Sequence, residues 1–125
     1  MTWQPYVVTI AGCMQLISGV VHVVSSDRPA LATIRSLGAD AYWQRRLQAT
    51  LFAGSITRAV VGIAILYCGL LYFHDHVEVA RGIVMIVLLP PASSAVLIPL
   101  LTPSDARKAV AHGAIVVLAA AGLWL

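Results

Sequence analysis

Four long apolar segments separated by short polar ones dominate the pattern of this 125-residue chain. The ranges 5–26, 59–73, 82–101 and 109–125 contain no Asp, Glu, Lys or Arg. Each can be extended to the ~20 residues that a helix needs to cross a hydrocarbon layer about 30 Å thick. A soluble domain of this length would instead show amphipathic helices, each with one charged face. The pattern therefore predicts an all-α integral membrane protein, a bundle of four transmembrane helices.

Residues with strong capping preferences set the limits of these helices. Asp40 is predicted to cap the second helix, and Thr102 with Pro103 marks the start of the fourth. We therefore expect a single transmembrane domain over 1–125, with helices at about 5–26, 41–73, 79–101 and 103–125.

The segment between the first two helices has a helical pattern of its own. Ser26 or Asp27 is a capping residue ahead of Pro29, and Gly38 is a typical helix-ending residue. Apolar residues recur between these signals with helical spacing, at Leu31, Ile34 and Leu37. We expect a short interfacial helix between helices 1 and 2, amphipathic and lying on the membrane surface.

The third helix contains two consecutive prolines, Pro90 and Pro91, near its middle. Each proline removes a backbone donor, and its ring clashes with the preceding turn. We expect a kink or break between Leu88 and Ser94. Because discontinuous membrane helices line substrate sites in transporters, this break favours a transporter or channel.

Composition and charge agree with a protein solvated by lipid. Hydrophobic residues make up 60% of the chain and charged residues 10%, with a mean hydropathy of +0.90. Typical globular domains are about 25% charged. The net charge of +3 would suggest a nucleic-acid partner in a soluble protein. Here the basic residues adjoin the predicted helices, so we expect membrane lipids, and no nucleic acid, as partners.

The basic residues are divided unequally between the two sides of the predicted bundle. One side has six of them, namely Arg28, Arg35, Arg45, Arg46, Arg107 and Lys108, and the other side has only Arg81. Positive residues favour the cytoplasmic side. We expect a multi-pass protein of the bacterial inner membrane with both termini outside the cytoplasm. The first helix lacks a basic leader and a cleavage site, which indicates that it is retained.

Arg58 is the one fully charged side chain well inside a predicted span. An intramembrane arginine is typical of an anion site, a gating charge or a buried pair. The alternative is structural, because its side chain tilts toward the helix N-terminus and can extend to the headgroups. Acidic residues are absent from the predicted membrane segments. That absence argues against a proton antiporter built on an intramembrane carboxylate.

Two histidines on other helices are predicted to lie near Arg58. The first helix presents one small and polar face, formed by Gly12, Gln15, Gly19 and His22. His22, Arg58 and His112 then share the cytoplasmic half of the bundle, with Gln15 on the same face. They can form a ligand pocket for a haem held by two histidines, a quinone headgroup or an anion. The alternative interpretation is hydrogen bonding between helices without a ligand.

Two further groups have weaker chemical signatures. His74 and His76 flank Asp75 in a short turn, with a composition that suits zinc or copper, although a solvated turn explains them equally well. Cys13 and Cys68 fall at similar predicted depth without a CxxC motif. They are expected to be packing residues, and a disulfide between them is the alternative.

These observations leave three function classes open. The first is a non-catalytic accessory or structural subunit of a larger membrane complex, respiratory or photosynthetic, which packs against other integral membrane subunits. The second is a small transporter or channel that acts through self-association. The third is a membrane redox or lipid-modifying enzyme that uses His22, Arg58 and His112, with haem or quinone as its cofactor.

Overall fold

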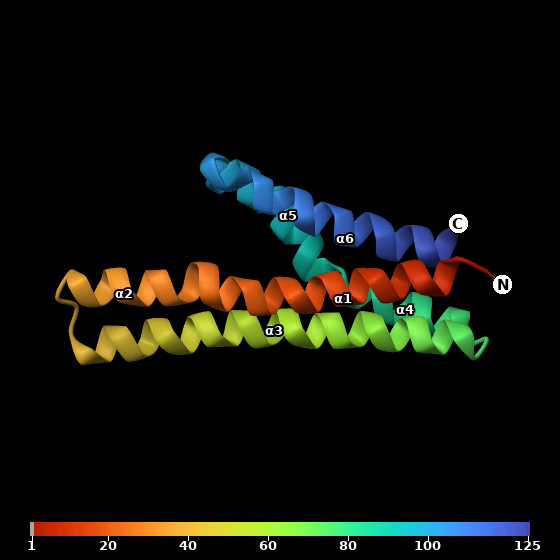
Figure 1. The fold of residues 1–125 in the computed structure, drawn as a ribbon, viewed down its shortest axis with the longest axis horizontal. Helices are drawn as coiled ribbons and strands as arrows, with labels where there is room; N and C mark the ends of the chain where they lie inside the picture. The colour runs from red at the N-terminus through yellow and green to blue at the C-terminus, as the bar shows by residue number, and fades with distance from the viewer. Residues whose placement is uncertain (1) are drawn as a thin grey trace.

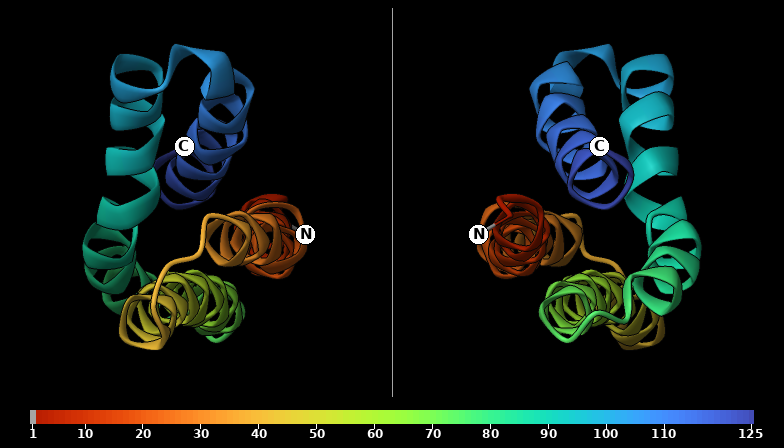
Figure 2. Two further views of the ribbon diagram at one scale, coloured as in Figure 1. Left: turned by 90° about the vertical axis from the view of Figure 1, so that its left-hand side faces the viewer. Right: turned by 90° about the vertical axis from the view of Figure 1, so that its right-hand side faces the viewer.

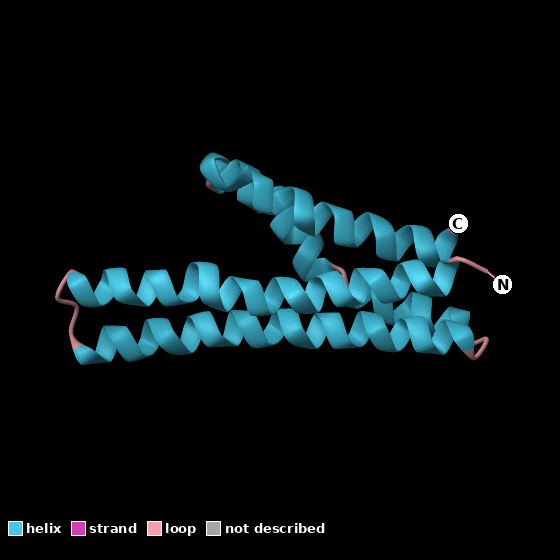
Figure 3. Cartoon of the chain, in the orientation of Figure 1, coloured by secondary structure: helices cyan, strands magenta, loops and turns pink. Residues whose placement is uncertain are grey.

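A computed structural model describes residues 2–125, and all regular structure in that range is helical (Figure 3). Four helical runs are long and apolar enough to cross a membrane, as the hydrophobic pattern predicts. The elements in chain order are α1 (Gln4–His22), the π-helical turn η1 (Val23–Asp27), α2 (Arg28–Ser36), α3 (Ala41–Phe73), α4 (Val77–Val87), α5 (Leu89–Leu101), the 3₁₀ turn η2 (Pro103–Asp105) and α6 (Ala106–Trp124).

The helices form two hairpins that separate toward one end of the molecule (Figure 1). The first pairs the run α1–η1–α2 with α3, and the second pairs α5 with α6. Helix α6 packs on α1, and α4 packs on α3, so the hairpins are joined near the end that holds both termini. The view along the helices shows α4 and α5 following one another around the bundle (Figure 2). The result is a fork whose two arms diverge away from the chain termini.

The prediction of a separate interfacial helix is wrong, because α2 continues α1 in nearly the same direction (Figure 1). Asp27 keeps helical backbone angles and does not cap α2. Pro29 in an unbroken α-helix would clash with the carbonyl of Ser25. The wider π turn just before it takes up that clash, and the Arg28 N–H bonds to Val23 five residues earlier. Gln4–Ser36 therefore forms one helical run of 33 residues.

The first hairpin is longer than a membrane is thick. Its two arms, Gln4–Ser36 and Ala41–Phe73, have 33 residues each. At 1.5 Å per residue they reach about 50 Å, against a hydrocarbon layer of about 30 Å. At the far tip Asp40 caps α3, where its carboxylate accepts from the Trp43 N–H at 3.0 Å.

The third of the long apolar runs, Val77–Leu101, is interrupted at Leu88, between α4 and α5. Pro90 and Pro91 then occupy the first turn of α5, where a helix needs no N–H donor from them. The Ser94 hydroxyl donates to the Pro90 carbonyl at 3.0 Å. The chain thus turns two residues before the proline pair, and the direction of α5 differs from that of α4 (Figure 1).

Glycines allow α1 and α3 to approach closely. A Cβ added at Gly62 would lie 2.7 Å from the backbone nitrogen of Leu16, and one at Gly12 would lie 2.7 Å from that of Leu66. Contacts of this kind are typical of membrane helices that pack through small residues. The apolar core next to this seam includes Val8, Ile65 and Ile115.

Candidate functional site

A cavity of about 180 Å³ lies where the two hairpins separate. Its walls include Gln15 from α1, Arg58 from α3, Pro91 and Ser94 from α5, and His112 from α6. Each of the four long apolar runs therefore contributes to it. The volume is far above the ~10–15 Å³ that one water molecule needs. We call this space the fork cavity.

Arg58 is the only formally charged residue among those that line the fork cavity. Within residues 2–125 its guanidinium has no hydrogen-bond or ion-pair partner. Its stem packs on α1, since a Cβ added at Gly19 would lie 3.3 Å from the Arg58 Cβ. The guanidinium extends back toward Gly54, one turn earlier, where an added Cβ would lie 3.8 Å from Nη1. An unpaired arginine inside a bundle is expensive, so a bound anion would stabilise it.

Gln15 and His112 are two buried polar residues of the same cavity. Their exposed fractions are 1% and 6%. Among the described residues, Gln15 Oε1 and His112 Nδ1 have no hydrogen-bond partner. Leaving a buried polar atom unbonded costs about 1–3 kcal/mol. Such atoms are normally satisfied by ordered water or a polar ligand, so both are available to bond to a molecule in the fork cavity.

A second cavity of about 380 Å³ adjoins the first, between α1 and α6. It is lined by His22, Ser25, Lys108 and His112 together with apolar residues. The structure therefore brings Arg58 and His112 to one cavity and His22 and His112 to the other. Arg58 is also close enough to interact electrostatically with both histidines. The predicted trio is thus adjacent, but no single described cavity holds all three.

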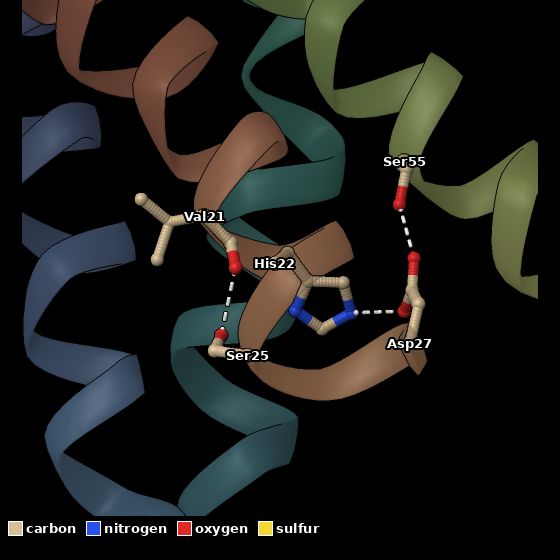
Figure 4. Close-up of polar contacts among 5 residues, drawn as sticks. All are labelled: Val21, His22, Ser25, Asp27 and Ser55. Carbon is tan, nitrogen blue, oxygen red and sulfur yellow. Dashed lines mark hydrogen bonds and ion pairs between the residues drawn. The ribbon is translucent and has the colours of Figure 1, made fainter. Parts of the chain in front are cut away.

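A buried carboxylate lies next to His22. Asp27 is 1% exposed and belongs to the helical run Gln4–Ser36, one residue beyond the charge-free range 5–26. Its Oδ1 lies 3.3 Å from His22 Nε2, and its Oδ2 accepts from the Ser55 hydroxyl at 2.5 Å (Figure 4). The π turn places the Asp27 side chain against α3, where Ser55 lies. A carboxylate shortly before Pro29 is typical of a helix cap, so no local pattern predicted this cluster.

The remaining candidates lie away from the fork. His74 and His76 are exposed in the turn between α3 and α4, where Asp75 has a positive φ of 61°. Within residues 2–125, no group of three or more His, Cys, Asp or Glu side chains is placed to hold a metal ion. Cys13 is exposed and Cys68 is buried, and both are free thiols.

Comparison with known protein families, curated proteins and solved structures finds no match for this chain. The chemistry of the site is therefore inferred from the functional groups that line it. A guanidinium, an imidazole and a carboxamide converge on the fork cavity, and the N-terminal end of α5 also borders it. Guanidinium groups and helix N-termini both favour anions. The arrangement can bind a small anion and surround it with hydrogen-bonding groups.

Proposed function

We propose that this protein is a small membrane transporter that binds a small anion in the fork cavity. The observation behind the proposal is the Arg58 guanidinium, which has no partner among the described residues and faces a cavity with two unbonded buried polar atoms. An anion would form charge-assisted hydrogen bonds with Arg58, and Gln15 and His112 would complete its coordination. The limited volume favours a monovalent inorganic anion or a short carboxylate.

The helix break supports a transport role for this site. The proline pair at the start of α5 lines the fork cavity together with Arg58. In transporters with broken helices, the half-helix ends face the substrate, and one part of the bundle rocks against the other. The hairpin α5–α6 would rock on the hairpin of α1 and α3 here, because the two hairpins already diverge away from the end that holds the chain termini (Figure 1).

Transport by the purified protein tests this proposal directly. Proteoliposomes would be loaded with chloride, nitrate, lactate or pyruvate, and release of each would be followed with a radiotracer. We expect flux of at least one of these anions to exceed that of protein-free liposomes at least tenfold. Fluxes equal to those of empty liposomes for all four anions would contradict the proposal.

We also propose the bacterial inner membrane as the location, with both termini outside. In a protein with Cys13 and Cys68 replaced by Ala, the thiol of Ser36→Cys should react with maleimide only from the cytoplasmic side, because the six basic residues lie at that end. The thiol of Asp75→Cys should react only from outside. Impermeant maleimide added to intact cells and to inverted vesicles measures both. Labelling of Ser36→Cys from outside would refute the orientation.

Replacing Pro90 and Pro91 by Ala should reduce anion flux about tenfold or more while the protein still folds. Alanine restores two backbone donors and removes the ring clash, so α4 and α5 would approach one straight helix and close the fork cavity. The measurement is tracer flux, with circular dichroism as the folding control. Pro99→Ala is the matched variant, since Pro99 lies inside α5 away from the cavity lining. Unchanged flux in the double variant would show that transport does not depend on the helix break.

A role as an accessory subunit is the second candidate, and one observation favours it. The run Val77–Leu101 has only 17% of its most apolar window buried, the lowest share of the four. This surface would suit another integral membrane subunit or self-association as well as lipid. Purification in mild detergent distinguishes an accessory subunit from a transporter, because a stable complex with other proteins supports the subunit role. A visible haem spectrum or a bound quinone would instead support an enzyme that uses His22, Arg58 and His112.

A further inference from the structure

The buried cluster of His22, Asp27 and Ser55 is separate from the anion-binding groups of the fork cavity. Asp27 receives a hydrogen bond from Ser55 on α3 and lies 3.3 Å from His22 on its own helical run (Figure 4). Arg58 is not within ion-pair distance of it, although the two charges interact electrostatically. The carboxylate, which is 1% exposed, therefore contacts one hydroxyl and one imidazole directly, and Arg58 acts on it only through its charge at longer range.

The cluster borders two cavities. Asp27 lines a cavity of about 90 Å³ between η1, α2 and α3, together with Arg28 and Gln48. His22 lines the 380 Å³ cavity, which His112 shares with the fork cavity. Asp27 and His22 thus lie between the polar tip of the first hairpin and the anion site. The other ionisable groups that face His22 from neighbouring helices are Arg58, Lys108 and His112.

Charge balance links the two sites. With the fork cavity free of an anion, the positive Arg58 offsets the negative Asp27. A monovalent anion on Arg58 leaves Asp27 as an uncompensated buried charge, which is costly in an apolar bundle. One proton on the Asp27–His22 pair, either as a neutral acid or as an imidazolium beside a carboxylate, restores neutrality. Anion binding and proton binding should therefore favour each other, and linkage makes the effect reciprocal.

We propose that the Asp27–His22 pair binds a proton that is transported together with the anion, so that the protein is a proton–anion symporter. This proposal rests on the proposed function of the fork cavity. In each cycle the pair takes one proton from water on one side of the membrane. It releases that proton to water on the other side, and the anion dissociates from Arg58. One positive and one negative charge cross together, so transport is electroneutral.

The test measures tracer uptake into proteoliposomes with a pH gradient, using whichever of chloride, nitrate, lactate and pyruvate shows the largest flux. A valinomycin clamp holds the membrane potential at zero, and a trapped pH dye reports protons. Wild-type protein should accumulate the anion at least fivefold when the outside is more acidic, with one proton entering per anion. Asp27→Asn should lose this accumulation. Asp105→Asn, at the acidic last residue of η2, is the matched control and should keep it.

Anion-for-anion exchange measured without a pH gradient distinguishes failure of the symport proposal from failure of the anion-transport proposal. Exchange by wild-type protein with no accumulation under the gradient would overturn the symport proposal and leave the anion transporter standing. The absence of any exchange would overturn both. If Asp27→Asn is misfolded, His22→Gln, which keeps a hydrogen-bonding side chain, provides the second variant. A His22→Gln protein that still accumulates the anion with the wild-type pH dependence would also overturn the proposal.

Discussion

Replacing Arg58 by Ala should abolish anion transport and leave the bundle folded. The guanidinium is the one formal positive charge on the fork cavity, and within residues 2–125 it makes no hydrogen bond or ion pair, so its loss breaks no direct contact between helices. Asp27, whose charge it offsets at longer range, keeps its contacts to Ser55 and His22. A hydrogen bond to a charged group contributes about 1.5–3 kcal/mol. Loss of two such bonds would weaken anion binding by at least a hundredfold. Tracer flux and anion-dependent thermal stabilisation of the detergent-solubilised protein measure the loss.

Arg58→Lys separates a ligand role from a structural one. Lysine keeps a positive charge that can extend to the headgroups, but it lacks the planar fork of donors that holds an anion in two places. A ligand site therefore predicts flux well below wild type in this variant. A structural charge predicts that Lys restores both stability and flux. Arg107→Ala, an exposed arginine at the start of α6, is the control and should leave flux unchanged.

Gly62→Leu should have the largest effect on folding. The new Cβ would lie 2.7 Å from the Leu16 nitrogen and 2.9 Å from its Cα, and backbone atoms of a packed helix cannot rotate away. Overpacking typically costs about 1–3 kcal/mol, and separation of α1 from α3 would also disrupt the core. We expect the free energy of unfolding to fall by about 3 kcal/mol. Denaturation followed by circular dichroism in detergent measures it.

Gly82→Leu is the matched control for that variant. Gly82 lies on α4 with no atom within 4 Å of the position of its absent Cβ, so a side chain there meets open space. Its stability should stay within about 0.5 kcal/mol of wild type. Equal destabilisation by both substitutions would show that the close approach of α1 and α3 does not determine stability.

Local sequence patterns account for much of the fold. Hydrophobic run lengths predict four membrane-crossing helices, and the Asp40 signal predicts the cap of α3 that the structure contains. The spacing of Gly12, Gln15 and Gly19 predicts the inward face of α1, and all three are buried. These features are predictable because each depends on residues within a few turns of one another.

Features that depend on contacts between distant residues were harder to predict. Asp27 meets Ser55 across 28 positions, and no local pattern specifies that pairing. The expected end of the first helix was wrong because a proline can be accommodated in two ways, by a cap or by a π turn. Packing of η1 and α2 against α3 accompanies the second solution here.

The π turn also determines how the first helical run tolerates changes in chain length. Each residue of an α-helix advances the direction of its side chain by about 100°. The extra residue in Val23–Asp27 therefore sets α2 in a different rotational phase from α1. Deleting one residue there would turn Asp27 away from Ser55, while adding one to the loop at Gly38 would leave both helices in phase. In homologous chains, insertions and deletions should accordingly collect at the hairpin tip and be excluded from the segment between His22 and Asp27.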